Sequence, residues 1–313
     1  MRLVVIGQAA FGQRVLDGLI DAGHEAALVL APATIGSRED PLTKAARTRG
    51  LPLLTPSSYR SPEVAEAVRA AGADLGVLAF VTKIVPFSVF DAPRQGSICF
   101  HPSLLPRYRG GSALAWQLIR GEDRGGFTIF WVDEGVDTGP ILLQREVPID
   151  AGDTAGSLYF EKIFEPGISA MIEAVGLAAD GRAARAPQDD AEASHDPLCG
   201  DAHVRIVWQR PAVSVYNLVR GADPKPGAYA VWKGSRLRLF GPRREVDANG
   251  AGLAGTVVHL RDGRLHVAVG PGAGEGAISF AQARLDEGAK GAAAEVATAA
   301  GIQAGSILED GDA

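Results

Sequence analysis

The chain has 313 residues, of which 46% are hydrophobic, and its formal net charge is −6 at pH 7. This length accommodates two domains, and no apolar run reaches the roughly 18 residues that a membrane-spanning helix needs. The acidic balance argues against nonspecific nucleic-acid binding, and two cysteines provide neither a disulfide framework nor a metal cluster.

Short apolar runs alternate with helix-like segments along the first part of the chain. The first run begins almost at the N-terminus, without the layout of a signal peptide, so we expect a cytoplasmic protein. Apolar runs predict strands at 3–6, 25–30, 51–54, 74–80, 97–100, 127–132 and 141–147. Helical spacing predicts helices at 11–22, 41–50, 62–71, 112–119 and 154–177. This alternation predicts an α/β fold with a Rossmann-like, mostly parallel sheet and helices on both faces.

The rest of the chain has a different pattern. A stretch rich in Ala, Asp and Pro without clear periodicity predicts a linker, which we place at 184–204. It separates a predicted catalytic domain, 1–183, from a second domain, 205–313. In the second domain we expect a helix at 211–220 and strands at 229–232, 236–240, 255–260, 264–269 and 277–280. Short strands between turn signals are typical of a small barrel or sandwich.

Two helix ends and one glycine turn can be interpreted individually. Ser112 is the predicted N-cap of its helix, and Gly121 is the predicted stop. The turn between Gly7 and Gly12 can cradle phosphate at a helix N-terminus, but Ala9 breaks the dinucleotide-binding glycine pattern. A tight strand-to-helix turn is the favoured interpretation, and we expect no NAD.

The segment 99–112, Cys-Phe-His-Pro-Ser-Leu-Leu-Pro-Arg-Tyr-Arg-Gly-Gly-Ser, is the strongest functional signal. It places His101 between a buried strand and a loop stiffened by prolines, which suits a preorganised site. A satisfied structural histidine is the alternative. Cys99 lies two residues earlier, on the same side of the predicted strand. It is either the nucleophile of a Cys–His pair or a small apolar residue, and we favour the second.

A second loop, 133–139, follows the predicted strand at 127–132 and carries Asp133, Glu134 and Asp137. Loops at strand ends of an α/β sheet meet in the crevice where ligands bind, so we expect Asp137 near His101. A carboxylate there favours the charged imidazolium, which can stabilise an oxyanion. A solvated turn is the alternative. A calcium loop is disfavoured because the oxygen spacing is irregular and no distal Glu follows.

Other titratable residues give weaker signals. The remaining histidines have no metal-ligand spacing, so we expect no metal: His24, His195, His203, His259 and His266. The local basic cluster is either a solvated face or a contact for phosphate or RNA: Arg236, Arg238, Arg243 and Arg244.

The two loops together resemble the folate-dependent formyltransferase superfamily. The resemblance rests on HPSLLPRYRGG at 101–111 and GFTIFWVDEGVDTG at 126–139, and extends to segments 5–12 and 219–229. This superfamily includes methionyl-tRNA formyltransferase and the N-terminal hydrolase/formyltransferase domain of 10-formyltetrahydrofolate dehydrogenase, and the chain is similar to both. The resemblance implies the formyltransferase fold and 10-formyltetrahydrofolate as the formyl donor, with no metal.

The resemblance also implies roles for particular residues. His101 and Asp137 match the catalytic His and Asp of the family, and Cys99 stands at the position of the family's Asn. Loss of that amide removes one oxyanion donor. The implied folate-binding residues are Phe80, Val81, Thr82, Lys83, Ile84, Asp133, Glu134, Gly135 and Val136. The implied acceptor loop includes Ser103, Arg107, Arg109 and Gly110.

The formyl acceptor stays open at the level of sequence. Water or an amine is the favoured acceptor, and tRNA is the first alternative. The segment 35–42 is short and carries few cations, whereas the resemblance implies a longer basic insertion in the tRNA enzyme. A sugar amine is a further alternative, and a non-catalytic folate-binding module is the alternative of a different class.

Overall fold

The computed structural model describes residues 1–245, 252–271 and 276–311. The chain forms two compact units, of which the first comprises Met1–Gly110, Gly126–Val147 and Phe160–His195. The second comprises Gly111–Gly125, Pro148–Tyr159 and Asp196–Ala313. The linear domain boundaries that we predict from the sequence stay a prediction. In the described ranges, no helix combines the length and apolar character needed to cross a membrane.

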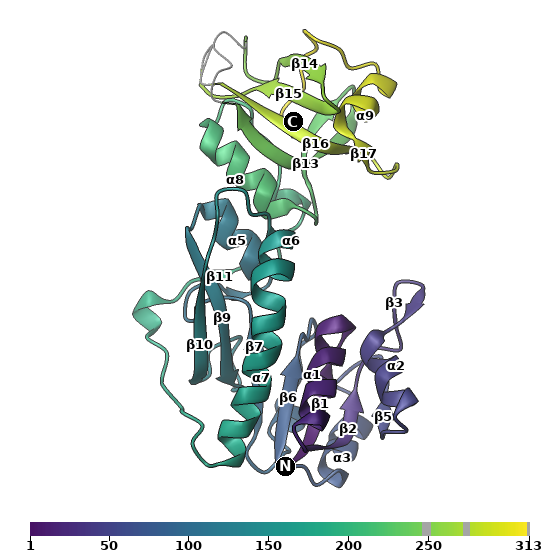
Figure 1. The fold of residues 1–313 in the computed structure, drawn as a ribbon, viewed down its shortest axis with the longest axis vertical. Helices are drawn as coiled ribbons and strands as arrows, with labels where there is room; N and C mark the ends of the chain where they lie inside the picture. The colour runs from purple at the N-terminus through teal and green to yellow at the C-terminus, as the bar shows by residue number, and fades with distance from the viewer. Residues whose placement is uncertain (246–251, 272–275, 312–313) are drawn as a thin grey trace. The chain divides into compact units, whose positions relative to one another are not determined.

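The first unit is built on a sheet with the strand order β10-β9-β7-β6-β1-β2-β5 (Figure 1). Its strands are β1 (Arg2–Gly7), β2 (Glu25–Leu30), β5 (Leu53–Leu54), β6 (Leu75–Ala79), β7 (Ser97–His101), β9 (Arg124–Trp131) and β10 (Ile141–Pro148). The pairs β1–β2, β2–β5, β1–β6 and β6–β7 are parallel, whereas β7 and β9 are antiparallel. The predicted mostly parallel α/β sheet is therefore confirmed.

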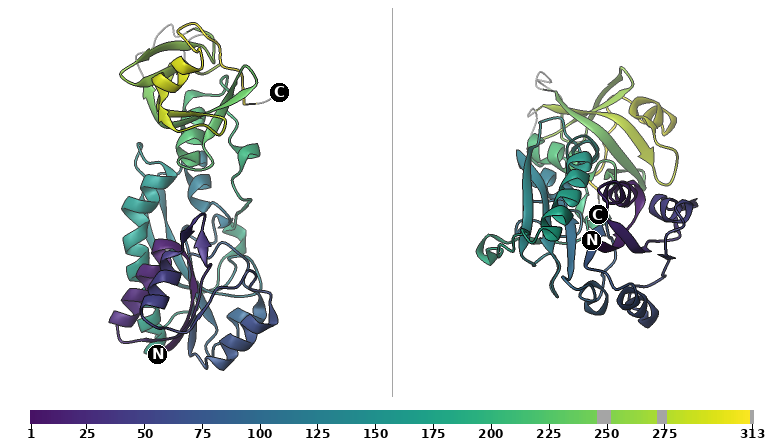
Figure 2. Two further views of the ribbon diagram at one scale, coloured as in Figure 1. Left: turned by 90° about the vertical axis from the view of Figure 1, so that its right-hand side faces the viewer. Right: turned by 60° about the horizontal axis from the view of Figure 1, so that its bottom comes forward.

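Helices pack on both faces of this sheet. On one face, α1 (Ala9–Asp21) buries Phe11, whose ring centroid lies 4.5 Å from that of Phe100 on β7. Helix α7 (Phe164–Ala179) lies beside α1 (Figures 1 and 2), and α2 (Pro41–Thr48) also packs against α1. On the other face, α3 (Pro62–Ala70) and α4 (Phe87–Phe90) contribute Val64 and Val89 to a core with Val4. Successive strand residues point to opposite faces, so the continuous apolar runs of β1 and β6 are buried on both sides of the sheet.

The structure differs from the predicted elements at several points. The predicted helix 154–177 is interrupted: α6 (Ala155–Ser157) and a π-helical turn (Leu158–Ile163) precede α7. Ser112 is the N-cap residue of α5 (Ala113–Arg120), as predicted, but its backbone is left-handed and its side chain makes no capping hydrogen bond. Its hydroxyl instead accepts a hydrogen bond from the Cys199 amide. Gly121 ends α5 with a φ of +79°, as predicted. The hairpin of β3 (Thr34–Ile35) and β4 (Arg38–Glu39) was not predicted.

The second unit contains an antiparallel sheet with the order β12-β13-β16-β15-β14, and β17 pairs with β16. Its elements are α8 (Ala212–Ala222), β12 (Ala228–Trp232), β13 (Ser235–Glu245), β14 (Val257–Arg261), β15 (Arg264–Ala268), β16 (Ala277–Leu285), β17 (Gly291–Ala292) and α9 (Ala293–Ala299). Bridges from Glu309 to Val231 and from Ile307 to Thr256 join the two sheet edges. This closure agrees with the predicted β-rich, barrel-like domain.

Candidate active site

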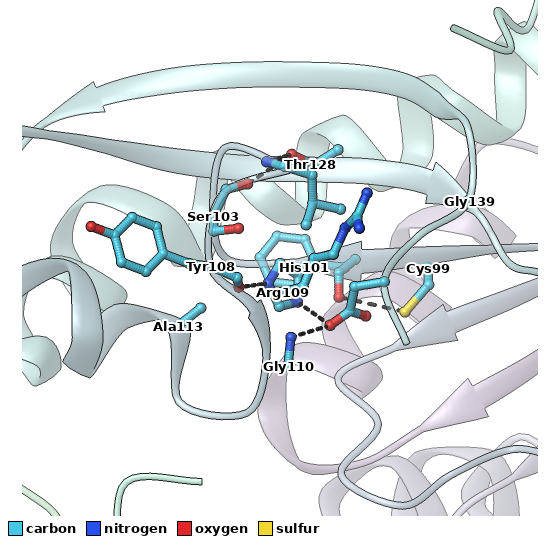
Figure 3. Close-up of polar contacts among 12 residues, drawn as sticks. Cys99, His101, Ser103, Tyr108, Arg109, Gly110, Ala113, Thr128 and Gly139 are labelled. Carbon is cyan, nitrogen blue, oxygen red and sulfur yellow. Dashed lines mark hydrogen bonds and ion pairs between the residues drawn. The ribbon is translucent and has the colours of Figure 1, made fainter. Parts of the chain in front are cut away.

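His101 is held at the end of β7 by a hydrogen bond to a main-chain carbonyl. Its Nε2 lies 2.7 Å from the carbonyl oxygen of Tyr108, and the imidazole is buried (Figure 3). Tyr108 has a φ of +62°, and its amide donates a 2.7 Å hydrogen bond to Ser194 Oγ. A positive φ is uncommon for a bulky residue, so this loop is held in an unusual conformation that aims a carbonyl at His101. Because a carbonyl only accepts, Nε2 carries a hydrogen and Nδ1 is the ring nitrogen left for chemistry.

Asp137 faces that free nitrogen. Its Oδ2 lies 3.4 Å from His101 Nδ1. Strand β9 runs antiparallel to β7, so Trp131 pairs with Ile98 and the following loop starts beside the first half of β7. The loop then returns along β7 to bring Asp137 to His101. The structure thus brings together the two residues that the sequence selects, but along a different path from the expected meeting of carboxyl-terminal strand ends.

Three contacts hold Asp137 in this position. Its backbone is left-handed, with a φ of +57°, and its Oδ2 accepts a 2.8 Å hydrogen bond from the Gly110 amide. Its carbonyl accepts a 2.9 Å bond from Gln188 Nε2, which also donates to Gly139 O at 2.7 Å. A Cβ at Gly139 would lie 1.7 Å from the Trp131 carbonyl oxygen, so this loop needs glycine there.

Gln188 is a site residue that sequence reasoning missed. It falls in the predicted linker 184–204, where no periodicity or motif distinguishes one polar residue from another. Its Oε1 accepts from Arg109 Nε at 3.1 Å and from a terminal guanidinium nitrogen at 2.8 Å. The buried Arg109 also bonds Asp190 at 2.8 Å. Arg109 therefore orients Gln188, which in turn holds the Asp137 loop.

The pair can both stabilise negative charge and move a proton. When Nε2 carries the hydrogen, a neutral imidazole presents the lone pair of Nδ1 to the Asp137 carboxylate, and the two groups repel. The His101–Asp137 contact is therefore favourable only when one more proton is bound between Nδ1 and the carboxylate. An imidazolium in this place can stabilise an oxyanion, and the carboxylate can accept a proton from a nucleophile. The 3.4 Å separation exceeds the 2.7–2.9 Å typical of charge-assisted bonds, so a substrate oxygen can replace this contact at small cost.

Cys99 lies on β7 near this pair (Figure 3). Its Sγ contacts the Phe100 carbonyl oxygen at 3.6 Å. Removal from solvent, with a smaller contribution from the Asp137 charge, raises the pKa of the Cys99 thiol well above its usual range. Because the thiolate is the nucleophilic form, this environment favours the interpretation of Cys99 as a small packing residue.

The predicted folate-binding segment after β6 is largely exposed. Thr82 Oγ1 donates to Gln8 Oε1 at 3.4 Å, and Lys83 Nζ donates to Ser57 O at 3.1 Å. A cavity of only about 10 Å³ lies between Gln8, Tyr59 and residues 81–83. Phe80 has a φ of +62° and Ile84 is 69% exposed.

The acidic loop is organised from within. Asp133 Oδ1 accepts from the Gly135 amide at 3.1 Å and from Thr138 Oγ1 at 2.7 Å. A Cβ at Gly135 would lie 2.0 Å from Thr138 Oγ1, so only glycine fits. Glu134 and Val136 are exposed. The described ranges contain no group of three or more His, Cys, Asp or Glu side chains that could hold a metal ion.

The polar groups of the predicted acceptor loop mainly bond to other groups of the protein and hold the loop in its conformation. Ser103 is fully buried, its Oγ donates to Arg107 O at 2.7 Å, and its carbonyl accepts from Thr128 Oγ1 at 2.7 Å. The Arg107 guanidinium lies 5.5 Å from the Tyr108 ring centroid. The Gly110 amide contacts Asp137 directly, and the Ser103 amide bonds the main-chain carbonyl of His101. Their roles toward an acceptor stay a prediction.

The glycine turn before α1 already holds a negative charge. The buried Asp40 accepts a 2.7 Å bond from the Ala9 amide through Oδ2. Its Oδ1 accepts from the amides of Leu42 and Thr43, at 2.9 and 3.2 Å, and so caps α2. An internal carboxylate thus occupies the place at the α1 N-terminus where a ligand phosphate would bind.

Comparison with known proteins identifies the family. The model of the formyl transferase family matches residues 1–175, and the model of the formyl transferase C-terminal domain matches residues 201–301. The chain belongs to the formyl transferase family. The family resemblance, the formyltransferase fold and the assignment as an enzyme of a folate-dependent family are thereby confirmed.

Relatives within this family differ in their activities. The chain is 42% identical over 246 residues to mitochondrial 10-formyltetrahydrofolate dehydrogenase of Mus musculus, covering 77% of this chain and 27% of that protein. It spans about a quarter of the length of such dehydrogenases. It is 34% identical over 276 residues to methionyl-tRNA formyltransferase of Nitrosospira multiformis, covering 86% and 88%. HypX of Aquifex aeolicus in complex with tetrahydrofolic acid shares the fold, with a TM-score of 0.71 at 23% identity, covering 96% and 47%.

Proposed function

We propose that the chain transfers the formyl group of 10-formyltetrahydrofolate to water or to a small amine and releases tetrahydrofolate. The observation that carries this proposal is the His101–Asp137 pair, in which Tyr108 fixes Nε2 as a donor and leaves Nδ1 facing the carboxylate. An acyl-transfer step needs these two functions, an oxyanion stabiliser and a proton acceptor.

In the proposed reaction, the formyl carbon lies next to His101 and the nucleophile lies next to Asp137. The nucleophile forms a bond to the formyl carbon, and the carbonyl oxygen becomes an oxyanion that the imidazolium stabilises. Asp137 accepts the proton of the nucleophile. The bond from the formyl carbon to N10 then breaks, and that proton passes to N10 of tetrahydrofolate. Gln188 and Gly110 keep Asp137 in place during these steps.

We place the pterin of the donor against residues 80–84 and 133–136. Ile84 and Val136 expose 69% and 49% of their surfaces, which supports an apolar contact with the pterin face. The polar edge of the pterin lies against the Asp133–Gly135 turn, whose conformation is held by the bond from the Gly135 amide to Asp133.

The Asp40 carboxylate at the N-terminus of α1 favours a formyl acceptor that has no phosphate group near this helix end. Asp40 already occupies the α1 N-terminus and would repel an anion there. Water and small uncharged amines meet no such barrier. The cationic side chain of Arg109 is already bound to Gln188 and Asp190.

Methionyl-tRNA is the second candidate acceptor, because the relatedness to the Nitrosospira enzyme extends over most of both chains. The segment 34–39 argues against it. This segment is a hairpin of two-residue strands with a single arginine, Arg38, instead of a long basic insertion.

One experiment separates these acceptors. Purified protein is incubated with 10-formyltetrahydrofolate carrying a labelled formyl carbon, alone and with cell extract, and the labelled products are identified by mass spectrometry. Labelled formate without extract supports hydrolysis, and a labelled small amine supports transfer. Label on tRNA moves the assignment to the second candidate. Binding of the donor without release of tetrahydrofolate under any condition would overturn the enzymatic proposal and favour a folate-binding module.

A further inference from the structure

The second unit contains a cavity of about 500 Å³ whose polar lining is mainly positive. Its four cationic side chains are Lys225, Arg238, Arg284 and Lys290. Its apolar wall consists of Leu198, Pro224, Pro226 and Phe240. In the part of the chain that the structure describes, no carboxylate lines this cavity. The volume lies within the range of about 300–1,000 Å³ typical of sites for small organic ligands.

The two arginines of this lining lie opposite each other on neighbouring strands. Arg238 on β13 pairs in register with Arg284 on β16, so two like charges stand directly opposite one another. Such a pair is destabilising unless an anion lies between or beside the charges. Asp201 supplies part of this compensation: it bonds Arg238 at 2.9 and 2.8 Å. The Arg238 bond and the nearby arginines lower the pKa of the Asp201 carboxyl, despite some opposing desolvation. Arg238, which the sequence places in a local basic cluster, is therefore buried and paired.

Arg284 is less completely compensated. Among the described residues, its buried Nε has no hydrogen-bond partner. A buried guanidinium N–H without a partner costs free energy that a bound acceptor would recover. This nitrogen belongs to one of the residues that line the cavity.

The remaining cations border the apolar wall. Lys290 Nζ lies 3.7 Å from the Phe240 ring centroid and 3.9 Å from Asp223 Oδ1. Lys225 lies between the two prolines of the lining. The lining thus carries four positive charges. The neighbouring carboxylates are Asp223, Asp201, which also pairs with Arg236, and Glu287, which interacts with Arg238. None of them lines the cavity, so an incoming anion would meet a positive surface.

We propose that this cavity is a binding site for an organic phosphate, separate from the His101–Asp137 site. The phosphoryl oxygens accept from Arg284, Lys225 and Lys290, because guanidinium and ammonium groups are the usual donors to phosphate. The organic part lies against Phe240 and the prolines. This combination of charge and apolar wall excludes a purely apolar ligand. The proposal does not depend on the identity of the formyl acceptor.

Isothermal titration calorimetry of the full chain at low salt tests the site with ADP, inorganic pyrophosphate and adenosine. We expect saturable binding of ADP with a Kd below about 1 mM, weaker binding of pyrophosphate, and no binding of adenosine. The variants Arg284→Gln and Lys225→Gln should each weaken ADP binding about tenfold or more. The matched control Arg261→Gln removes an exposed arginine of β14 outside the lining and should leave the Kd unchanged.

The outcomes that overturn the proposal are distinct. No ADP binding at concentrations up to about 10 mM, or equal binding of adenosine, removes the phosphate site. An unchanged Kd in both lining variants removes the cavity as its location. Binding of a short RNA without binding of ADP or pyrophosphate shows an extended nucleic-acid surface instead. Thermal melting of each variant checks that it is folded. If Arg284→Gln unfolds, the Lys225→Gln variant still tests the proposal, because Lys225 lies outside the sheet.

Discussion

Gln188 donates its side-chain amide to the main-chain carbonyl of Asp137, across 51 residues of sequence. The same amide bonds Gly139, and its oxygen is held by Arg109. A carboxylate proposed to move a proton is therefore positioned by a glutamine that touches no reacting atom. Positional errors near 1 Å at a reacting group can cost about 10²-fold in rate, so this support has a measurable consequence.

Replacing Gln188 should lower turnover without unfolding the protein. Gln188→Ala removes both donated bonds, and we expect kcat to fall by about 10- to 100-fold with a smaller change in KM. Gln188→Glu keeps an acceptor for Arg109 but has no N–H for Asp137 and Gly139, so it should resemble the alanine variant. Steady-state release of tetrahydrofolate is the measurement. If Gln188→Glu has wild-type kcat, the contact with Arg109 matters and the bonds to the loop do not.

His101 and Asp137 should each be needed for the chemical step. We expect His101→Ala to lower the rate by about 10²–10³ or more, as removal of an oxyanion donor does in well-studied hydrolases. Asp137→Asn keeps an acceptor for the Gly110 amide but loses the charge, and we expect a comparable loss. His195→Ala, which changes an exposed histidine, is the control. Rates within about threefold of wild type in both site variants would refute the assigned roles.

Cys99 should be dispensable as a nucleophile. Because the raised pKa keeps its thiol protonated, Cys99→Ala should retain turnover within about threefold, and alkylation of Cys99 by iodoacetamide should be slow at pH 7.5. Mass spectrometry after timed labelling measures the second effect. Rapid alkylation at Cys99, or loss of activity in the alanine variant beyond about tenfold, would restore the nucleophile interpretation.

Asp40 should stabilise the first unit by satisfying two helix N-termini. Asp40→Ala leaves the amides of Ala9, Leu42 and Thr43 without this acceptor, and we expect the free energy of unfolding to fall by about 3 kcal/mol. Urea unfolding measures this loss.

The Asp40→Ala variant also tests whether the turn before α1 can bind an external anion. Sulfate stabilises proteins in general, so the informative quantity is the difference between variant and wild type. A larger sulfate-induced rise in Tm for Asp40→Ala would show that the emptied turn accepts an external anion. Equal rises in both proteins would contradict that expectation.

His266 should make the second unit sensitive to acid. Its ring lies 4.2 Å from that of His259, and burial, followed by the neighbouring His259, lowers the pKa of His266 below its ordinary value of 6.5. The unfolded chain then binds this proton more readily than the folded chain. Stability contributed by the neutral form is complete above pH 6.5 and decreases as the pH falls below it, by up to about 1.4 kcal/mol per pH unit.

Urea unfolding at pH 7.5 and 5.5 checks this expectation. Carboxylate protonation contributes to both wild type and His266→Gln, so the difference between their pH slopes isolates the imidazole. The wild type should lose more stability between these two pH values than the variant. Equal losses would show that His266 does not titrate in this range.

Much of the fold follows from local sequence pattern, whereas the site depends on longer-range placement. The pattern of apolar residues was sufficient to predict α1 and β1. The proline-rich loop after Phe100 was sufficient to select His101 as a candidate catalytic residue. The same reasoning paired His101 with Asp137 but assumed a common strand edge. The antiparallel direction of β9 is set by its pairing with β7, which a single strand's pattern does not contain.

The missed features share one physical cause: their interactions are not repeated along the chain. Gln188 contributes through single bonds to distant carbonyls, so no period or composition marks it. Ser112 has the residue type of a cap, but its left-handed backbone directs its hydroxyl to Cys199 instead. The π-helical turn before α7 keeps an apolar pattern close to that of an ordinary helix, so periodicity alone predicted one continuous element.

The bridges made by Ile307 and Glu309 have a practical consequence for handling the protein. They cover the outer hydrogen-bonding groups of two strands that would otherwise be able to recruit strands from other molecules. Proteolytic trimming upstream of residue 307 would remove this protection while leaving most of the apolar core in place. Such a shortened form would be prone to self-association, and intact-mass analysis of soluble and precipitated fractions would detect it.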